Sequence, residues 1–238
     1  MRTKPPHRDI LDNRPQHPEI PRDPMPGLPY PDIFSAPPKL PKKVYIVGSG
    51  PRGEDAFKTI PEDACTIALN SMISQWRPWT YWMAFDYRIV DSDFWCEIKV
   101  PKKTVTLFGA RLANRVWSDP AVFPKIKPNY YFRYHPGMSG ASFVEGQPCL
   151  VDGLLRGLTV AGCALQFAYW FGATEIVLCG IDMFGQNHLD GHVNIDVKYL
   201  AEWPWSKNLS RLCGVLRSKG ISICSLSPTN LEVPLCRP

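Results

Sequence analysis

The most constraining feature of the 238-residue sequence is an apolar helix followed almost at once by an apolar strand. Residues 158–171 have the length of a helix and are apolar on nearly every face, and residues 175–179 form a short apolar run. Gly172 stands between them, where a glycine commonly ends a helix. A helix that is apolar all round has to be covered by protein, and a strand without polar alternation is typical of the middle of a parallel sheet. This pattern indicates the interior of an α/β domain.

The same alternation of strands and helices runs through the chain from residue 43. We expect further strands at 44–47, 65–69, 79–85, 104–107, 129–134 and 221–224, and further helices at 52–59, 86–98 and 206–218. The segment 109–156 is ambiguous apart from its strand. Alternating strands and helices predict a single Rossmann-like, doubly wound α/β domain over residues 43–238, with a mostly parallel sheet and helices on both faces.

The first 42 residues differ in composition from this domain. Twelve of the 25 prolines lie between Pro5 and Pro41, mixed with Arg, Asp and His. Because proline lacks a backbone donor and restricts the residue before it, neither a helix nor a sheet runs through such a segment. We therefore expect a proline-rich, extended or disordered arm over residues 1–42, which either stays free or docks on a partner.

Composition and cysteine spacing argue against several classes of protein. The net charge of +5 is mild, and no basic run is interleaved with exposed aromatics, so nucleic-acid binding is not expected. The longest apolar stretch, 158–173, is shorter than the roughly 20 residues of a membrane span. There is no CxxC pair for zinc, and the cysteines at 65, 163, 179 and 224 lie in apolar runs that suit reduced, buried thiols. With no signal peptide in the sequence, these features predict a cytoplasmic protein.

Small and polar residues follow the expected strands at one edge of the sheet, where open parallel sheets bind their ligands. We expect these residues to form one nucleotide-binding rim. Its expected members are Gly48, Ser49, Gly50, Pro51, Asn70, Asp86, Gly180 and Asp182, beside the segment 227–230.

The glycine turn after the first strand formally matches GxGxxG through Gly48, Gly50 and Gly53. A dinucleotide site also needs Asp or Glu at the end of the second strand, and the residue there is Asn70. A nicotinamide or flavin enzyme is therefore disfavoured. Free backbone donors beside a helix start would suit a phosphate, and a tight turn without a ligand is the alternative. Asn70 either binds a base or sugar, or caps a helix that starts at Ser71.

A polar loop with two histidines, His188 and His192, follows the strand 175–179. Two histidines and loose carboxylates are a poor metal site, so no metal site is expected there. Because histidine titrates near neutral pH, either one could take a proton from an attacking hydroxyl as a general base. Asp182 could bind ribose or a metal, or cap a turn.

In combination these motifs resemble a superfamily that contains the bacterial family 42 sialyltransferases and the 6-hydroxymethylpterin diphosphokinase-like proteins. The resemblance covers residues 43–231 through short motifs in order, and the most specific is the apolar helix into Gly172 followed by Gly180-Ile181-Asp182. The likeness to the sialyltransferases implies a CMP-sugar donor, a glycan or other hydroxyl acceptor, and no permanently bound cofactor. It also implies that the glycine turn, Asn70 and Thr159 lie near the nucleotide and that a histidine is the base.

The chain departs from the sialyltransferase pattern in three places. Those enzymes carry Gly-Asn-Gly-Pro-Ser at the turn, where residues 48–52 read GSGPR. They place Thr-Ser-Gly at the helix start, where residues 159–161 read TVA. Their catalytic histidine corresponds to about Trp203, so His188 or His192 would have to substitute for it.

Two other functions therefore stay open at the level of the sequence. One is a magnesium-dependent pyrophosphokinase, for which Asp86 and Asp182 would supply the carboxylates. The other is a non-catalytic nucleotide-binding or structural protein on the same fold. A homo-oligomer is compatible with each.

Overall fold

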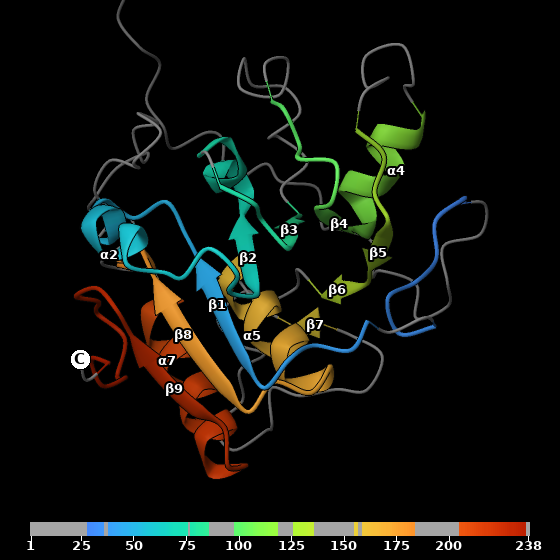
Figure 1. Ribbon diagram of the computed structural model, residues 1–238. Coiled ribbons are helices and arrows are strands. Elements are labelled where there is room, and N and C mark those ends of the chain that lie inside the picture. The colour runs from blue at the N-terminus through green and yellow to red at the C-terminus, as the bar shows by residue number, and fades with distance from the viewer. Residues whose placement is uncertain are drawn as a thin grey trace, which may run out of the picture.

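The computed structural model describes residues 28–35, 38–75, 77–85, 98–118, 126–135, 155–156, 159–183 and 205–236. At its centre lies a seven-stranded parallel sheet in the order β5-β4-β3-β2-β1-β8-β9 (Figure 1). The strands are β1 (Lys43–Val47), β2 (Thr66–Leu69), β3 (Tyr81–Ala84), β4 (Val105–Gly109), β5 (Tyr130–Phe132), β8 (Glu175–Cys179) and β9 (Ser222–Ser225).

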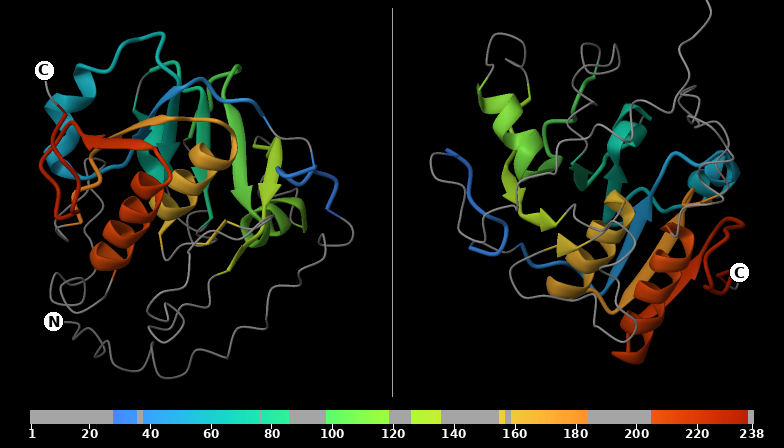
Figure 2. Two further views of the ribbon diagram at one scale, coloured as in Figure 1. Left: turned by 90° about the horizontal axis from the view of Figure 1, so that it is seen from below. Right: turned by 180° about the vertical axis from the view of Figure 1, so that it is seen from behind.

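Helices cover both faces of this sheet (Figure 2). One face packs on α5 (Val160–Trp170) and α7 (Trp205–Ser218), and the other on α2 (Glu54–Lys58), α4 (Ala110–Ser118) and the 3₁₀ turn η2 (Asn70–Ser74). The face under α5 and α7 forms the first core, and the face under α2, α4 and η2 forms the second core. Successive strand residues alternate between the two faces, so Ile46 belongs to the first core and Val47 to the second. The predicted doubly wound α/β fold is confirmed.

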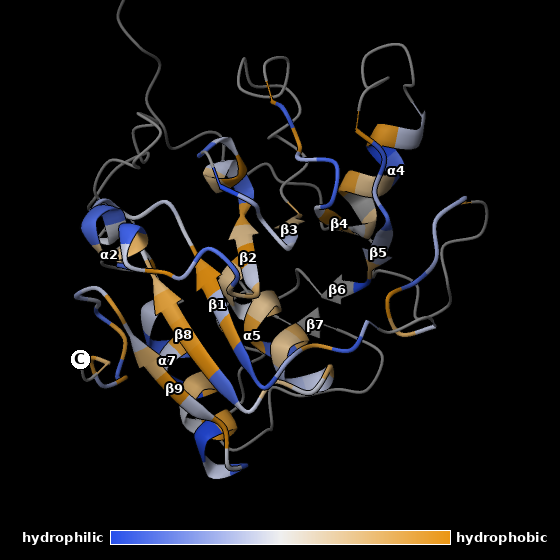
Figure 3. Cartoon of the chain, viewed as in Figure 1, coloured by the Kyte–Doolittle hydropathy of each residue, from blue (hydrophilic) through white to orange (hydrophobic). Residues whose placement is uncertain are grey.

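Helix α5 is deeply buried, as its all-round apolar sequence predicts. Its residues from Val160 to Ala168 are buried against β1, β2, β3 and α7. Gly172 has a φ of +102°, and the N–H of Ala173 donates to the carbonyl of Ala168 at 2.9 Å. This closure is the Schellman motif, in which glycine takes the left-handed position without a Cβ penalty. In Figure 3 the neighbouring strands β1 and β8 are strongly hydrophobic.

The ambiguous segment 109–156 contains elements that its sequence does not signal. Helix α4 starts directly after β4, and it buries Leu112, Ala113 and Val116 in the second core. Short helices of this kind are stabilised by tertiary packing more than by local signals. The expected strand 129–134 divides: β5 ends at Phe132, and the next strand, β6 (Tyr134–His135), pairs instead with β7 (Leu155–Arg156) in a second, two-stranded sheet.

Part of the proline-rich arm packs against the domain. Residues 28–35, which we call the strap, run along the outer edge of β5 (Figure 1). The N–H of Ile33 donates to the carbonyl of Tyr131 at 2.9 Å, and the N–H of Tyr131 donates to the carbonyl of Pro31 at 3.1 Å. The carboxylate of Asp32 forms a largely buried ion pair with Arg133 at 2.9 Å. Residues 1–27 lie outside the described part of the chain.

Cys224 in β9 forms a disulfide with Cys236, so the prediction that it is a reduced, buried thiol is wrong. The chain turns back after β9 and brings the two Cα atoms to 5.1 Å. Cys65, Cys163 and Cys179 are free, as expected, and the last two are buried. The cytoplasmic location, which rests partly on a reduced Cys224, stays a prediction. None of the helices in the described ranges is long and apolar enough to cross a membrane.

Candidate nucleotide-binding site

The order of the sheet reverses between β1 and β8. From β1 the chain fills one side of the sheet through β2 to β5, and it then crosses over to add β8 and β9 on the other side. Open α/β sheets bind their ligands at such a switch point, outside the carboxyl ends of the strands. The glycine turn after β1 and the turn at Gly180 after β8 meet there.

These two turns pack backbone against backbone. The N–H of Gly48 donates to Cys179 O at 2.9 Å, and the N–H of Gly50 donates to Gly180 O at 2.8 Å. A Cβ on Gly50 would lie 2.6 Å from Gly180 O, and one on Gly53 would lie 2.5 Å from the Gly180 Cα. Glycine is required here because the two chains approach closer than any side chain allows.

The expectation that the glycine turn offers free backbone donors to a phosphate is wrong. The N–H of Gly48 donates to Cys179 at the end of β8, and the N–H of Gly50 donates to Gly180 in the turn that follows. The N–H of Gly53 donates to Gly50 O at 3.0 Å. Pro51, the first residue of the 3₁₀ turn η1 (Pro51–Gly53), has no N–H to offer. Ser49 lies half-buried in the same turn. The turn therefore shapes the edge of the sheet through packing.

Asp182 joins three segments of the rim. Its buried carboxylate accepts the N–H of Arg52 through Oδ2 at 2.8 Å, and its carbonyl accepts the N–H of Asn230 at 3.0 Å. Burial, with a contribution from Asp182, raises the pKa of the neighbouring Cys179 thiol to about 12, so this thiol stays protonated at neutral pH. Among the residues described, no three His, Cys, Asp or Glu side chains gather as metal ligands.

Asn70 lies at the carboxyl end of β2 in a strained conformation. Its φ is +48°, and its carbonyl accepts the indole N–H of Trp82 at 2.7 Å. Asn70 is the first residue of η2, whose N-cap is Leu69, and its side-chain oxygen accepts no capping hydrogen bond, so the alternative that Asn70 caps a helix starting at Ser71 is wrong. Its Oδ1 is buried and has no hydrogen-bond partner among the described residues. Asn70 therefore carries both backbone strain and an unsatisfied acceptor.

The N-terminus of α5 also lies at this edge of the sheet. Because α5 returns the chain to the start of the parallel strand β8, it runs opposite to the strands and begins at their carboxyl ends. Thr159 is its N-cap, with Oγ1 accepting the N–H of Gly162 at 3.2 Å. The positive end of the helix dipole thus faces the rim.

The C-terminal segment completes the rim, as the sequence predicts. Ser227 Oγ accepts the N–H of Gly180 at 3.1 Å, and Thr229 Oγ1 donates to Ile181 O at 2.6 Å. The structure therefore brings together the glycine turn, the turn after β8 and the segment 227–230. Asp86, His188 and His192 lie outside the described residues.

Two contacts of the site had no signal in the sequence. The backbone N–H of Arg52 reaches Asp182 across 130 residues, and the indole of Trp82 holds Asn70 from the next strand. Neither bond joins residues of a local motif. Only the pairing of parallel strands brings these groups together.

The sequence matches no known protein-family model and no curated protein. In structure the chain is similar to the sialyltransferase CstII from Campylobacter jejuni in complex with the substrate analogue CMP-3FNeuAc, at 16% identity and a TM-score of 0.42, over 79% of this chain and 81% of that one. It is similar to CstII in complex with cytidine-5′-monophosphate, at 17% identity and a TM-score of 0.48, over 84% and 87% of the two chains. A third similar structure is CstII with a trisaccharide acceptor and CMP, at 18% identity and a TM-score of 0.46, over 79% and 82%. Likeness at this level assigns no activity, so a function has to be argued from the residues of the site.

Proposed function

We propose that this chain is a nucleotide-sugar-dependent glycosyltransferase, which takes a CMP-sugar as donor and passes the sugar to a hydroxyl of a glycan or similar acceptor. The observation that carries the proposal is Asn70 beside the switch point, with its left-handed backbone and with an Oδ1 that has no hydrogen-bond partner among the described residues. Each feature costs about 1–3 kcal/mol. Strain of this kind concentrates in ligand clamps, where a bound ligand supplies the missing partner.

The chemistry of Asn70 suits a nucleoside. A carboxamide offers one acceptor oxygen and two N–H donors, so it can pair with the amine and ring edge of cytosine or with ribose hydroxyls. An aspartate at this position would be the partner of a dinucleotide, and Asn70 lacks that charge. The resemblance of the rim motifs to the family 42 sialyltransferases narrows the nucleoside to cytidine.

The phosphate is best accommodated at the start of α5. The glycine N–H groups already donate to Cys179, Gly180 and Gly50, so they do not serve an added anion. The first turn of α5 has N–H groups that point along the helix axis, and Thr159 adds a hydroxyl. In this arrangement Asn70 holds the nucleoside and the helix end holds its phosphate.

His188 and His192 remain the proposed general bases. In the transfer, the acceptor oxygen bonds to the anomeric carbon as the bond from that carbon to the CMP phosphate oxygen breaks. The histidine takes the proton of the acceptor hydroxyl, and CMP leaves with the bonding electron pair. Single replacements of the two histidines, followed by measurement of donor hydrolysis and transfer, identify the one that acts.

A thermal-shift screen of cytidine, uridine and adenosine nucleotides, with and without magnesium, tests the binding step. At a CMP concentration of 100 times Kd, we expect the unfolding midpoint to rise by about 5–10 °C without magnesium. Asn70→Gly should abolish this response and leave the free protein at least as stable, because glycine accepts a φ of +48°. Ser71→Ala, the neighbouring change, should respond as the wild type does.

Other outcomes of the screen would replace this proposal. Stabilisation by a triphosphate only when magnesium is present would support a pyrophosphokinase. Stabilisation by no nucleotide would rule out both transferases and leave a structural role. A full CMP response in Asn70→Gly would show that nucleotide binding does not depend on Asn70.

A further inference from the structure

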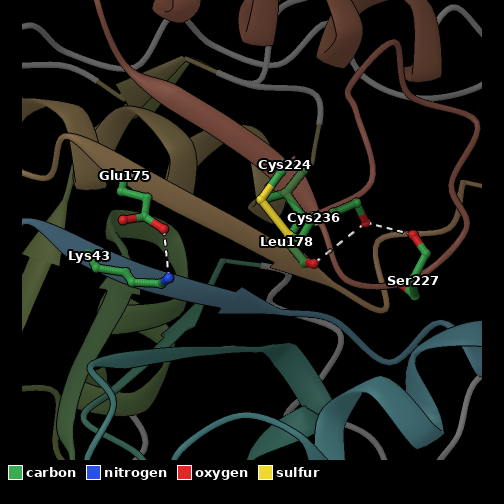
Figure 4. The surroundings of a disulfide bond; sticks show 7 residues. Lys43, Glu175, Leu178, Cys224, Ser227 and Cys236 are labelled. Carbon is green, nitrogen blue, oxygen red and sulfur yellow. Dashed lines mark hydrogen bonds and ion pairs between the residues drawn. A yellow bond between two sulfur atoms is a disulfide. The ribbon is translucent and has the colours of Figure 1, made fainter. Parts of the chain in front are cut away.

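The disulfide closes a loop that belongs to the candidate site. Cys224 lies in β9, and Cys236 follows it by 12 residues (Figure 4). We call residues 226–235 the rim loop. Besides the disulfide, two backbone bonds hold its two ends together: Ser225 N–H to Pro234 O at 2.9 Å, and Cys236 N–H to Ser225 O at 2.8 Å. Leu235, the loop residue next to Cys236, is 59% exposed.

The rim loop sets the conformation of the turn after β8. Ser227 Oγ accepts the N–H of Gly180, a residue that takes a φ of +62°. Thr229 and Asn230 bind the next two carbonyls, those of Ile181 at 2.6 Å and Asp182 at 3.0 Å. The turn after β8 is thus fixed from one side by three residues of the loop, Ser227, Thr229 and Asn230.

The turn after β8 also holds the glycine turn after β1 in place. Gly180 O accepts the N–H of Gly50, and the Asp182 carboxylate accepts the N–H of Arg52. A continuous set of hydrogen bonds therefore runs from the disulfide through the rim loop to the switch point. Reduction removes the covalent closure at one end of this set and leaves the two backbone hydrogen bonds of Ser225 to hold the ends of the loop together.

We propose that the Cys224–Cys236 disulfide is a redox-responsive clamp on the nucleotide-binding edge, and that its reduction by a dithiol weakens CMP binding. The ligand part of this inference rests on the function proposed above. The reaction is ordinary exchange: one thiolate of the dithiol attacks a sulfur of the disulfide, which breaks the S–S bond, frees one cysteine and forms a mixed disulfide with the other. The second thiolate then attacks this mixed disulfide and releases the remaining cysteine. Two electrons and two protons pass to Cys224 and Cys236, and the dithiol becomes a cyclic disulfide.

The other described cysteines are poor competitors in this exchange. Burial raises the pKa of Cys65 to about 11 and of Cys213 to about 12, and it raises the pKa of Cys163 as well. Thiolates, not thiols, carry out exchange, so these groups react slowly at neutral pH. Cys224 and Cys236 are only half-buried, which leaves the disulfide within reach of a dithiol.

The test compares the oxidised protein, the same protein in dithiothreitol, and Cys236→Ser. All three carry Cys96→Ser and Cys149→Ser, so that these two cysteines do not form other disulfides. Peptide mass mapping first checks the Cys224–Cys236 link in the oxidised form. Amide hydrogen exchange of the segment 226–231 then reports the clamp without any ligand, and titration calorimetry with CMP reports the coupling.

On reduction we expect exchange at the Asn230 N–H to accelerate at least about tenfold and the Kd for CMP to rise about fivefold or more. Cys236→Ser should show both changes without reductant and no further response to it. Adding Cys65→Ser to the protein with Cys96→Ser and Cys149→Ser should change neither the hydrogen exchange nor the CMP affinity, in the oxidised or the reduced state.

Each contrary result has a distinct meaning. An oxidised protein without the Cys224–Cys236 link, or unchanged exchange in the rim loop on reduction, overturns the clamp. Faster exchange with equal CMP affinity in both states overturns the coupling. Faster exchange in a protein that never binds CMP leaves the clamp in place and refutes the proposed function.

Discussion

Gly48, Gly50 and Gly53 match a fingerprint usually associated with phosphate binding, but in this protein they serve packing. Each would place a Cβ 2.5–2.7 Å from atoms of the turn after β8. Their N–H groups are already used within the two turns. The requirement for glycine follows from the close approach of two backbones, and the ligand-facing chemistry falls to Asn70 and the start of α5.

This assignment predicts that Gly50→Ala destabilises the fold even without a ligand. The backbone of Gly50, at φ −64° and ψ 135°, suits alanine, so only the contacts with Gly180 O and the Asp182 carboxylate oppose the change. We expect a loss of about 1–3 kcal/mol in the free energy of unfolding, measured by urea denaturation. Gly214→Ala is the matched control: it is exposed on α7 with nothing within 4 Å, and it should gain about 0.5–1 kcal/mol. Equal effects of the two changes would contradict the packing role.

At the scale of elements, helix α5 packs across β1, β2 and β3 and forms the centre of the first core. Tyr81 of β3 meets Phe167 of α5 edge to face, with ring centroids 5.5 Å apart. Burial raises the pKa of the Tyr81 hydroxyl from 10.0 to about 12. Ionisation of Tyr81 at alkaline pH should therefore affect the stability of the interface between α5 and the sheet.

Between pH 10 and about 12 the unfolded chain loses the Tyr81 proton while the folded chain keeps it. The free energy of unfolding should consequently fall as pH rises through this window, by at most about 1.4 kcal/mol per pH unit from this group. Tyr81→Phe keeps the ring contact and removes the proton, so its stability should decline less steeply in chemical denaturation between pH 9 and 12. Parallel pH profiles for the two proteins would show that Tyr81 does not titrate in this way.

At the scale of the whole molecule, both edge strands of the sheet are covered by neighbouring segments. The strap pairs with β5 at one edge, and the rim loop pairs with β9 at the other. The strap adds backbone pairing to β5, and the ion pair of Asp32 with Arg133 joins residues 101 apart in sequence. Exposed edge strands invite association with other chains, and a packed segment prevents it. The domain therefore depends on residues that precede its first strand.

Asp32→Ala should destabilise the whole domain, because it leaves the largely buried Arg133 without its carboxylate. We expect a loss of about 3 kcal/mol in the free energy of unfolding, measured by thermal or urea denaturation. Asp55→Ala is the control, since its ion pair with Lys58 is exposed and should contribute little. If the two variants unfold alike, the ion pair of Asp32 with Arg133 does not stabilise the domain.

The sequence alone determined the class of fold and the chain segments that form the rim. Apolar runs such as 158–171 and 175–179 are buried wherever they fold, because exposing them to water is costly, and their alternation leaves few arrangements other than a doubly wound sheet. Gly172 also follows from local geometry, since a helix end there needs a left-handed residue.

Only the tertiary structure decided what the rim residues do. The glycine N–H groups are committed because β1 lies next to β8. The Oδ1 of Asn70 is buried without a partner among the described residues, and the disulfide forms because the chain turns back along β9. Helix α4 was missed for the same reason, as its stability comes from the core that it covers. Hydrophobic patterning is local and survives in the sequence, whereas hydrogen bonds between turns more than 100 residues apart exist only once the sheet has formed.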